Sequence, residues 1–236
     1  MKQVETAPEH GKNGVGPASA AASQVLADSS AIAGGKGAAV RRGNVIVLTG
    51  PSGVGKGTLT RQMLCTIPHL VKSVSVTTRA QRPGEAEGVD YFFVSRDEFD
   101  RIEEKGRLME FAEFAGNMYG TPKAWVEEQL KSGNDVLLEI EVQGAKQVRQ
   151  RRPESLLIFV SPPSFDSLRE RLEGRNTETP EKISARLEQA ELEMQERNLF
   201  HYEVVNDNID EAVSNLTHIV YAERCRIRKT AVISQK

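Results

Sequence analysis

Residues 50–58, with the sequence GPSGVGKGT, combine the residue types and the spacing of a phosphate-binding loop. The segment follows an apolar run at residues 44–49 that predicts a buried strand, and it precedes an expected helix over residues 56–67. Its four glycines let backbone N–H groups turn toward an anion, and the helix N-terminus adds a favourable dipole. A glycine-rich turn with a surface lysine is the alternative, which the combination of strand, spacing and helix disfavours. The predicted nucleotide-binding residues of the loop are Gly50, Pro51, Ser52, Gly53, Val54, Gly55, Lys56, Gly57 and Thr58.

The position after the lysine departs from the general phosphate-loop pattern. That pattern has Ser or Thr there, whereas this chain has Gly57, and the hydroxyl follows at Thr58. Thr58 is therefore the candidate ligand of Mg²⁺, either directly or through a water. Glu139 and Glu141 end a predicted strand over residues 135–141 and should point the same way, which makes them further candidates for Mg²⁺ or its waters. For Glu139 an ion pair with a neighbouring arginine is the alternative.

Three downstream segments carry the residues of a second binding site. Residues 75–85 hold Arg79 and Arg82, whose guanidinium groups suit the gripping of one phosphate. Tyr91 could add a hydrogen bond to it. The third segment, residues 108–122, contains Glu110, Tyr119 and Thr121. Taken singly, an arginine pair is more often a solvated surface, and a Glu among apolar residues can simply face water.

Together these segments resemble the guanylate kinase family over residues 44–228. The matching motifs, in the family's order and spacing, are SVTTR-x-x-RPGE, G-x-DY-x-F-V, E-F-A-x-F-x-G-x-x-YGT and L-x-I-x-x-QG. The resemblance implies that GMP binds at Ser75, Arg79, Arg82, Tyr91, Glu110, Tyr119, Thr121 and Glu141.

The chemistry of guanine agrees with that assignment. Guanine presents two adjacent donors, N1–H and the 2-amino group, and an acceptor at O6. One carboxylate, Glu110, can accept both donors, while the hydroxyls of Ser75 and Thr121 can serve O6. Adenine has an acceptor at N1, which a carboxylate would repel. We therefore expect base selectivity to depend mainly on Glu110.

The resemblance also implies a lid over ATP at residues 168–195. Its cationic residues are Arg171, Arg175 and Arg186, with residues 174–177 as the tip. Arg169 and the acidic residues between positions 188 and 196 are expected to be solvated helix surface. Asn206, in the segment VVND, matches the family's position beside the adenine of ATP.

The reaction implied is transfer of the γ-phosphoryl group of ATP to GMP, and also to dGMP, giving GDP or dGDP and ADP with Mg²⁺. A phosphate monoester has a second pKa of about 6, so the acceptor is largely ionised at neutral pH and needs no general base. Catalysis would then be positioning and charge. The predicted catalytic residues are Lys56, Arg79, Arg171, Arg175 and Arg186.

The elements that must position these residues alternate short apolar runs with longer amphipathic ones, which is typical of an α/β fold. Strands are expected at 74–76, 91–94, 108–115, 156–160 and 202–205, and helices at 123–131, 165–172, 181–199 and 209–228, besides those named above. Ser95 with Glu98 forms a capping box that should open another helix. The predicted fold is a phosphate-loop-type parallel-sheet core flanked by helices, with a small mixed GMP-binding region at residues 75–125 and a helical lid.

Residues 1–42 differ from this domain, which is assigned to residues 43–236. The stretch from 17 to 39 is rich in Ala, Ser and Gly and lacks aromatic residues, so it predicts a flexible tail. Abundant Ser and Ala are typical of an organellar transit peptide, but Glu5, Glu9 and Asp28 count against one. A cytoplasmic location is therefore expected, with an organellar one as the alternative.

Composition excludes several other classes of protein. The formal net charge of −2 argues against a general nucleic-acid binder. No apolar run approaches the ~18 residues of a membrane-spanning helix. The two cysteines, Cys65 and Cys225, form neither a disulfide framework nor a metal-ligand pair. We expect small-molecule substrates, without nucleic-acid or membrane partners, and the sequence does not determine the oligomeric state.

The same residues disfavour two other functions. Guanylate kinase-like binding modules of scaffold proteins typically lack an intact phosphate loop and lid arginines, and this chain has both. A kinase acting on AMP or a pyrimidine monophosphate is disfavoured by Glu110 together with Ser75 and Thr121.

Overall fold

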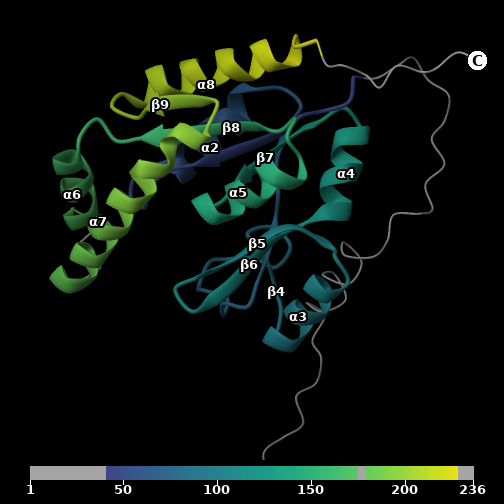
Figure 1. Ribbon diagram of the computed structural model, residues 1–236, viewed down its shortest axis with the longest axis horizontal. Helices are drawn as coiled ribbons and strands as arrows, with labels where there is room; N and C mark the ends of the chain where they lie inside the picture. Colours follow the sequence, from purple (N-terminus) through teal and green to yellow (C-terminus); the bar gives the residue numbers. More distant parts are fainter. Residues whose placement is uncertain (1–40, 175–178, 228–236) are drawn as a thin grey trace, which may run out of the picture.

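The computed structural model describes residues 41–174 and 179–227, which form a layered α/β structure (Figure 1). The central sheet has five strands in the order β2-β7-β1-β8-β9, all parallel. The bounds of these strands are Val45–Thr49 (β1), Leu70–Lys72 (β2), Asp135–Glu139 (β7), Leu156–Ser161 (β8) and Tyr202–Val205 (β9).

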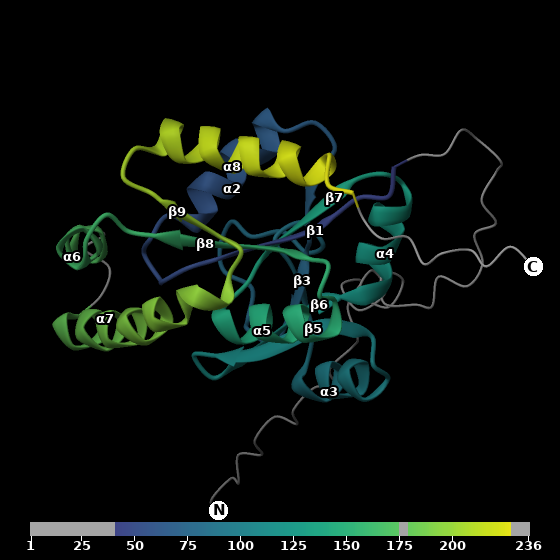
Figure 2. The same ribbon diagram turned by 45° about the horizontal axis from the view of Figure 1, so that its top comes forward.

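Alternation along β1 shows how helices cover both faces of this sheet. Ile46 and Leu48 pack with residues of α2 (Lys56–Thr66) and α8 (Ile209–Arg224). Val45 and Val47 point the other way and pack with residues of α4 (Lys123–Lys131) and α5 (Val142–Arg151). The two helix layers lie on opposite sides of the sheet (Figure 2). Because both faces of β1 are buried, its sequence is a continuous hydrophobic run, as is usual for parallel strands.

A second, smaller sheet has four strands in the order β4-β3-β6-β5. Their bounds are Ser75–Thr77 (β3), Tyr91–Phe93 (β4), Leu108–Phe114 (β5) and Asn117–Pro122 (β6). The sheet is mixed, because β3 pairs parallel with β4 while the other pairings are antiparallel. Phe99 of α3 (Arg96–Glu104) lies in its separate apolar core, and the expected cap forms, since the Ser95 hydroxyl accepts from the Glu98 N–H.

Two helices form the lid segment, α6 (Phe165–Glu173) and α7 (Pro180–Gln195), followed by a 3₁₀ turn, η1 (Glu196–Leu199). They pack on one another through a small cluster that includes Leu168, Leu172 and Ala190. In Figures 1 and 2 they project past one end of the central sheet.

The predicted α/β class, with a parallel-sheet core and a small mixed sheet, is confirmed. Three elements were not expected: β2, β6 and α5. The strand expected over 135–141 ends at Glu139, because Glu141 already caps α5. The expected helix over 181–199 is α7 plus η1, and the last helix ends at Arg224. Within the described residues no helix is long and apolar enough to cross a membrane.

Asp135 joins the two described ends of the domain. Its carboxylate is fully buried at the start of β7. One oxygen accepts from the Asn44 N–H at 2.7 Å and from Arg41 at 3.0 Å, and the other accepts from Arg224 at 2.7 Å. Arg41 and Arg42 belong to the segment predicted as a tail, yet Arg41 pairs with Asp135 and Arg42 pairs with Glu127.

The substitution Asp135→Ala should lower the free energy of unfolding by about 3–5 kcal/mol, because it leaves the largely buried Arg224 without its carboxylate. Urea denaturation measures this. Glu154, which pairs with Arg152 at 2.9 Å but is half exposed, provides the matched control: Glu154→Ala should cost less than about 1 kcal/mol. Equal losses in the two variants would contradict the role assigned to Asp135.

Candidate active site

The loop between β1 and α2 has the backbone of an anion cradle. Gly53 and Gly55 adopt positive φ angles of 89° and 101°, in the left-handed region that favours glycine. A Cβ on Gly55 would lie only 2.6 Å from the Asn206 side-chain nitrogen, so a side chain there would have to displace Asn206. The Lys56 ammonium folds back over the loop and donates to the carbonyls of Gly50 and Pro51.

Two residues predicted at the ATP site support this loop from outside. The Asn206 amide donates to the Val54 carbonyl at 2.8 Å and is itself buried. Arg171 donates to the Asn206 carbonyl at 2.9 Å and to the Val54 carbonyl at 3.4 Å. Both side chains thus hold the shape of the loop at Val54, whatever contact they make with a nucleotide.

The lid segment reaches the loop through Arg186. Its guanidinium donates to the Ser52 hydroxyl at 2.6 Å, across 134 residues of chain. Arg175, the other predicted lid cation, lies outside the described residues, as does most of the predicted tip.

Glu139 lies where a cation beside the loop would need a ligand. One of its oxygens would be 3.6 Å from a Cβ built on Gly57, and Thr58 and Glu139 line the same hollow at the loop. The other oxygen is buried without a hydrogen bond, although the Lys72 ammonium approaches it to 3.4 Å. The ion pair is thus with a lysine and not with the arginine considered above. Among the described residues, no three His, Cys, Asp or Glu side chains gather into a metal-holding cluster.

A polar cavity of about 540 Å³ lies between the two sheets and brings most of the predicted acceptor residues together. Its lining includes Ser75, Arg79, Arg82, Tyr91, Glu110, Tyr119, Glu139 and Glu141, together with Lys56 and Arg186. Thr121 is the exception, because it is fully buried behind Glu110.

Glu85, which also lines this cavity, was missed as a functional residue. It pairs with Arg79 at 2.7 Å and accepts the Arg82 N–H at 2.8 Å, and the hydrogen bond from Arg79 lowers the pKa of Glu85. Arg79 also lies over the Tyr91 ring, 5.2 Å from its centre. Glu85 therefore holds the Arg79 guanidinium and the backbone at Arg82. The sequence signal for Glu85 was its position as the last residue of the motif RPGE.

Glu110 is the most deeply buried ionisable group of the cavity, with only 3% of its surface exposed. One oxygen accepts from the Thr121 hydroxyl at 2.6 Å. Burial raises the pKa of Glu110 to about 7, against the opposing effects of the Thr121 hydrogen bond and the charge of Arg151. The carboxyl is thus poised between its neutral and charged forms near neutral pH.

One sequence expectation for the lid was wrong. Glu193, among the acidic residues expected to be solvated, is only 6% exposed, and one of its oxygens lacks a hydrogen-bond partner. Gln189 donates to the other oxygen at 3.1 Å. Burial and the nearby charge of Glu141 raise the pKa of Glu193, while Lys56 lowers it. One face of the last turns of α7, which carries Ala190 and Glu193, is therefore buried, while Glu191 and Leu192 are exposed.

A phosphate loop at the carboxyl edge of a parallel sheet, facing a polar cavity on a second sheet, defines a phosphate-loop nucleotide-binding protein. Residues 42–223 match the family model described as guanylate kinase. A guanylate kinase of Desulfitobacterium hafniense is 49% identical over 193 residues, covering 82% of this chain and 96% of that one. One of Rubrobacter xylanophilus is 51% identical over 181 residues, covering 77% and 95%.

Among solved structures, the crystal structure of guanylate kinase from Anaplasma phagocytophilum superposes with a TM-score of 0.66. It is 37% identical in sequence and covers 79% of this chain and 89% of that one. The chain belongs to the guanylate kinase family.

The raised pKa of Glu110 predicts how stability depends on pH. The folded protein holds a proton on this group up to about pH 7, whereas the unfolded chain releases it near the ordinary value of 4.5. The contribution of Glu110 to stability is therefore present at low pH and is lost as the pH rises through about 7. From pH 5.5 to pH 8, the wild type should lose on the order of 2 kcal/mol of unfolding free energy relative to Glu110→Gln, measured by urea denaturation.

Glu113, exposed on the same strand, supplies the matched control. Glu113→Gln should follow the wild-type pH profile. Parallel profiles for wild type and Glu110→Gln would mean that Glu110 titrates as an ordinary surface carboxyl.

Proposed function

We propose that this protein transfers the γ-phosphoryl group of ATP to GMP, and also to dGMP, giving ADP and GDP or dGDP. The observation that carries this proposal is that one cavity is lined by Lys56 of the phosphate loop, the arginine pair Arg79 and Arg82, and the buried carboxyl Glu110. A phosphoryl donor, an acceptor phosphate and a base thus have separate groups to bind them within one cavity. Membership of the guanylate kinase family supports the same reaction.

Guanine is the base that suits Glu110. The carboxylate accepts N1–H and the 2-amino group, and Ser75 provides a hydroxyl in the same cavity for O6. The Thr121 hydroxyl donates its hydrogen bond to Glu110, so its part in base recognition is to orient the carboxylate. A base without these donors would leave a buried charge unpaired, which disfavours binding strongly.

The protein's contribution to phosphoryl transfer is charge and position. Lys56 moves from the loop carbonyls to the donor phosphates, while Arg79 and Arg82 hold the acceptor phosphate, with Tyr91 and Tyr119 beside them. Arg186, already bonded to the loop at Ser52, covers the transferred group with Arg171 and Arg175, which completes the predicted catalytic set.

Thr58 and Glu139 are the residues that would hold Mg²⁺, since both line one hollow at the loop and one Glu139 oxygen is buried without a hydrogen bond. When bound, the ion would neutralise charge on the donor phosphates as the phosphoryl group leaves. The arrangement is compatible with direct or water-mediated ligation by Thr58.

The remaining assignments are also part of this proposal. Residues 43–236 form the kinase domain, with the tail before it, and the location is cytoplasmic unless that tail proves to be a transit peptide. The substrates are small molecules, and neither nucleic acid nor membrane is expected as a partner.

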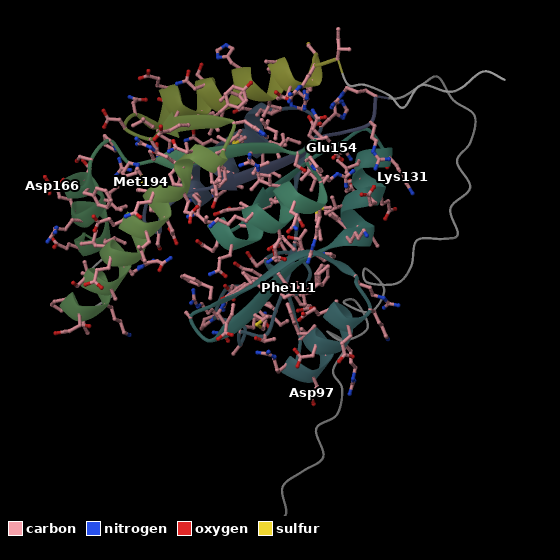
Figure 3. All side chains as sticks on the ribbon, in the orientation of Figure 1. Asp97, Phe111, Lys131, Glu154, Asp166 and Met194 are labelled. Atoms are coloured by element: carbon pink, nitrogen blue, oxygen red, sulfur yellow. The ribbon has the colours of Figure 1, made fainter. Side chains whose placement is uncertain are left out.

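The test is an ADP-release assay with ATP and Mg²⁺ and each of GMP, AMP, CMP, UMP and dTMP. Turnover should occur with GMP alone among these five. Lys56→Met should lower it at least about 100-fold, because the donor phosphates lose their cation. Lys131→Met, at the exposed end of α4 (Figure 3), is the control and should keep wild-type turnover. Turnover with another nucleotide would overturn the assignment of the base, and no turnover with any would favour a binding module.

A further inference from the structure

The strand that carries Glu110 is irregular at that point. In the pairing of β5 with β6, Leu108 lies opposite Pro122 and Phe111 opposite Gly120. Two residues of β5, Met109 and Glu110, therefore face the single residue Thr121. This is the geometry of a β-bulge, which re-aims a side chain and leaves part of the hydrogen-bond ladder unmade. The side chain of a bulged residue keeps a fixed direction only if contacts from outside the sheet support the bulge.

Helix α5 supplies such support from the core domain. Gln147 uses both ends of its amide on Phe111, accepting its N–H at 3.3 Å and donating to its carbonyl at 2.5 Å. Arg151, four residues later, donates to the Met109 carbonyl at 2.8 Å. The residues on either side of Glu110 are thus held by successive turns of one helix face. Figure 3 marks Phe111 on the strand that faces α5.

Gly144, three residues before Gln147 on the same face, lies against the carboxylate itself. A Cβ on Gly144 would be 2.3 Å from one Glu110 oxygen and 3.1 Å from the carboxyl carbon. Gly144 is in the first turn of α5, where the helix dipole favours a negative charge. Because Gly144 has no side chain, the Glu110 carboxylate can approach that turn. The backbone at Gly144 then limits the position of the carboxylate on one side.

We propose that Gly144 and Gln147 are specificity-determining positioning residues, which hold the bulge so that the Glu110 carboxylate faces the base of the acceptor nucleotide. This inference rests on the proposed function. Neither residue lines the acceptor cavity, so each acts through Glu110 and not by contact with substrate. The motif L-x-I-x-x-QG, which contains Gly144, thereby acquires a physical role in recognition of the base.

The test compares wild type with Gln147→Leu and Gly144→Ala, using GMP and inosine monophosphate, which lacks the 2-amino group. Both variants should raise KM for GMP about 10-fold or more, because a displaced carboxylate loses one of its two contacts. KM for ATP should change less than about 2-fold, since the phosphate loop is untouched. Preference for GMP over inosine monophosphate, as a ratio of kcat/KM values, should fall by a similar factor.

Two controls separate positioning from general damage. Gln150→Leu makes the same change at an exposed position of α5 and should match the wild type. In a Glu110→Gln background, the effect of Gln147→Leu on KM for GMP should shrink below about 2-fold, because the two residues act through one contact. Thermal unfolding checks that each variant is folded. Gly144→Ala keeps α5 intact, since alanine is the better helix former.

The outcomes are distinct. Equal rises in KM for GMP and ATP, an unchanged base preference, or full additivity with Glu110→Gln would each overturn the positioning role. A wild type that does not phosphorylate GMP would instead overturn the proposed function, and this inference with it.

Discussion

Burial of the Glu110 carboxyl is the physical constraint on which the arrangement of much of the second sheet depends. A carboxylate removed from water is disfavoured unless hydrogen bonds and charge compensate. Without ligand the compensation is partial, from the Thr121 hydroxyl and the charge of Arg151, which is why the pKa of Glu110 stays as high as about 7. Under the proposed function, a base with two adjacent donors would supply the hydrogen bonds that the protein itself does not give this carboxyl. The raised pKa of Glu110 and the proposed preference for guanine therefore have the same physical origin.

The phosphate loop has a different requirement, because its backbone N–H groups must stay free to bind an anion. Its carbonyl groups are held instead by side chains from distant parts of the chain. Asn206 and Arg171 both donate to Val54, and Lys56 donates to the first carbonyls of the loop. Because the contacts of Asn206 and Arg171 lie outside the cradle, they stiffen the loop without filling it. The close approach of Asn206 to Gly55 also explains why the glycine is needed there for more than its φ angle.

Local patterns in the sequence were sufficient where structure is decided locally. The phosphate loop, the Ser95 cap and helix α4 follow from neighbouring residues, and their bounds were predicted closely. Strand β6 contains a Gly and a Pro and lacks clear alternation, so only its pairing with β5 makes it a strand. Helix α5 was missed because its sequence is polar and includes Gly144. The burial of Glu193 depends on how α7 packs against the core, which helix periodicity does not reveal.

Helix α5 also contacts both the second sheet and the base of the lid segment. One face holds β5 through Gln147 and Arg151, while Lys146 pairs with Glu196 at 2.7 Å and Arg149 donates to the Leu199 carbonyl at 2.6 Å. Both of the latter contacts reach η1, at the base of the lid segment. Separation of β5 from the core would break several of these hydrogen bonds together. The helix that supports the strand carrying Glu110 thus also contacts the base of the lid segment, so the second sheet and the lid segment share one support.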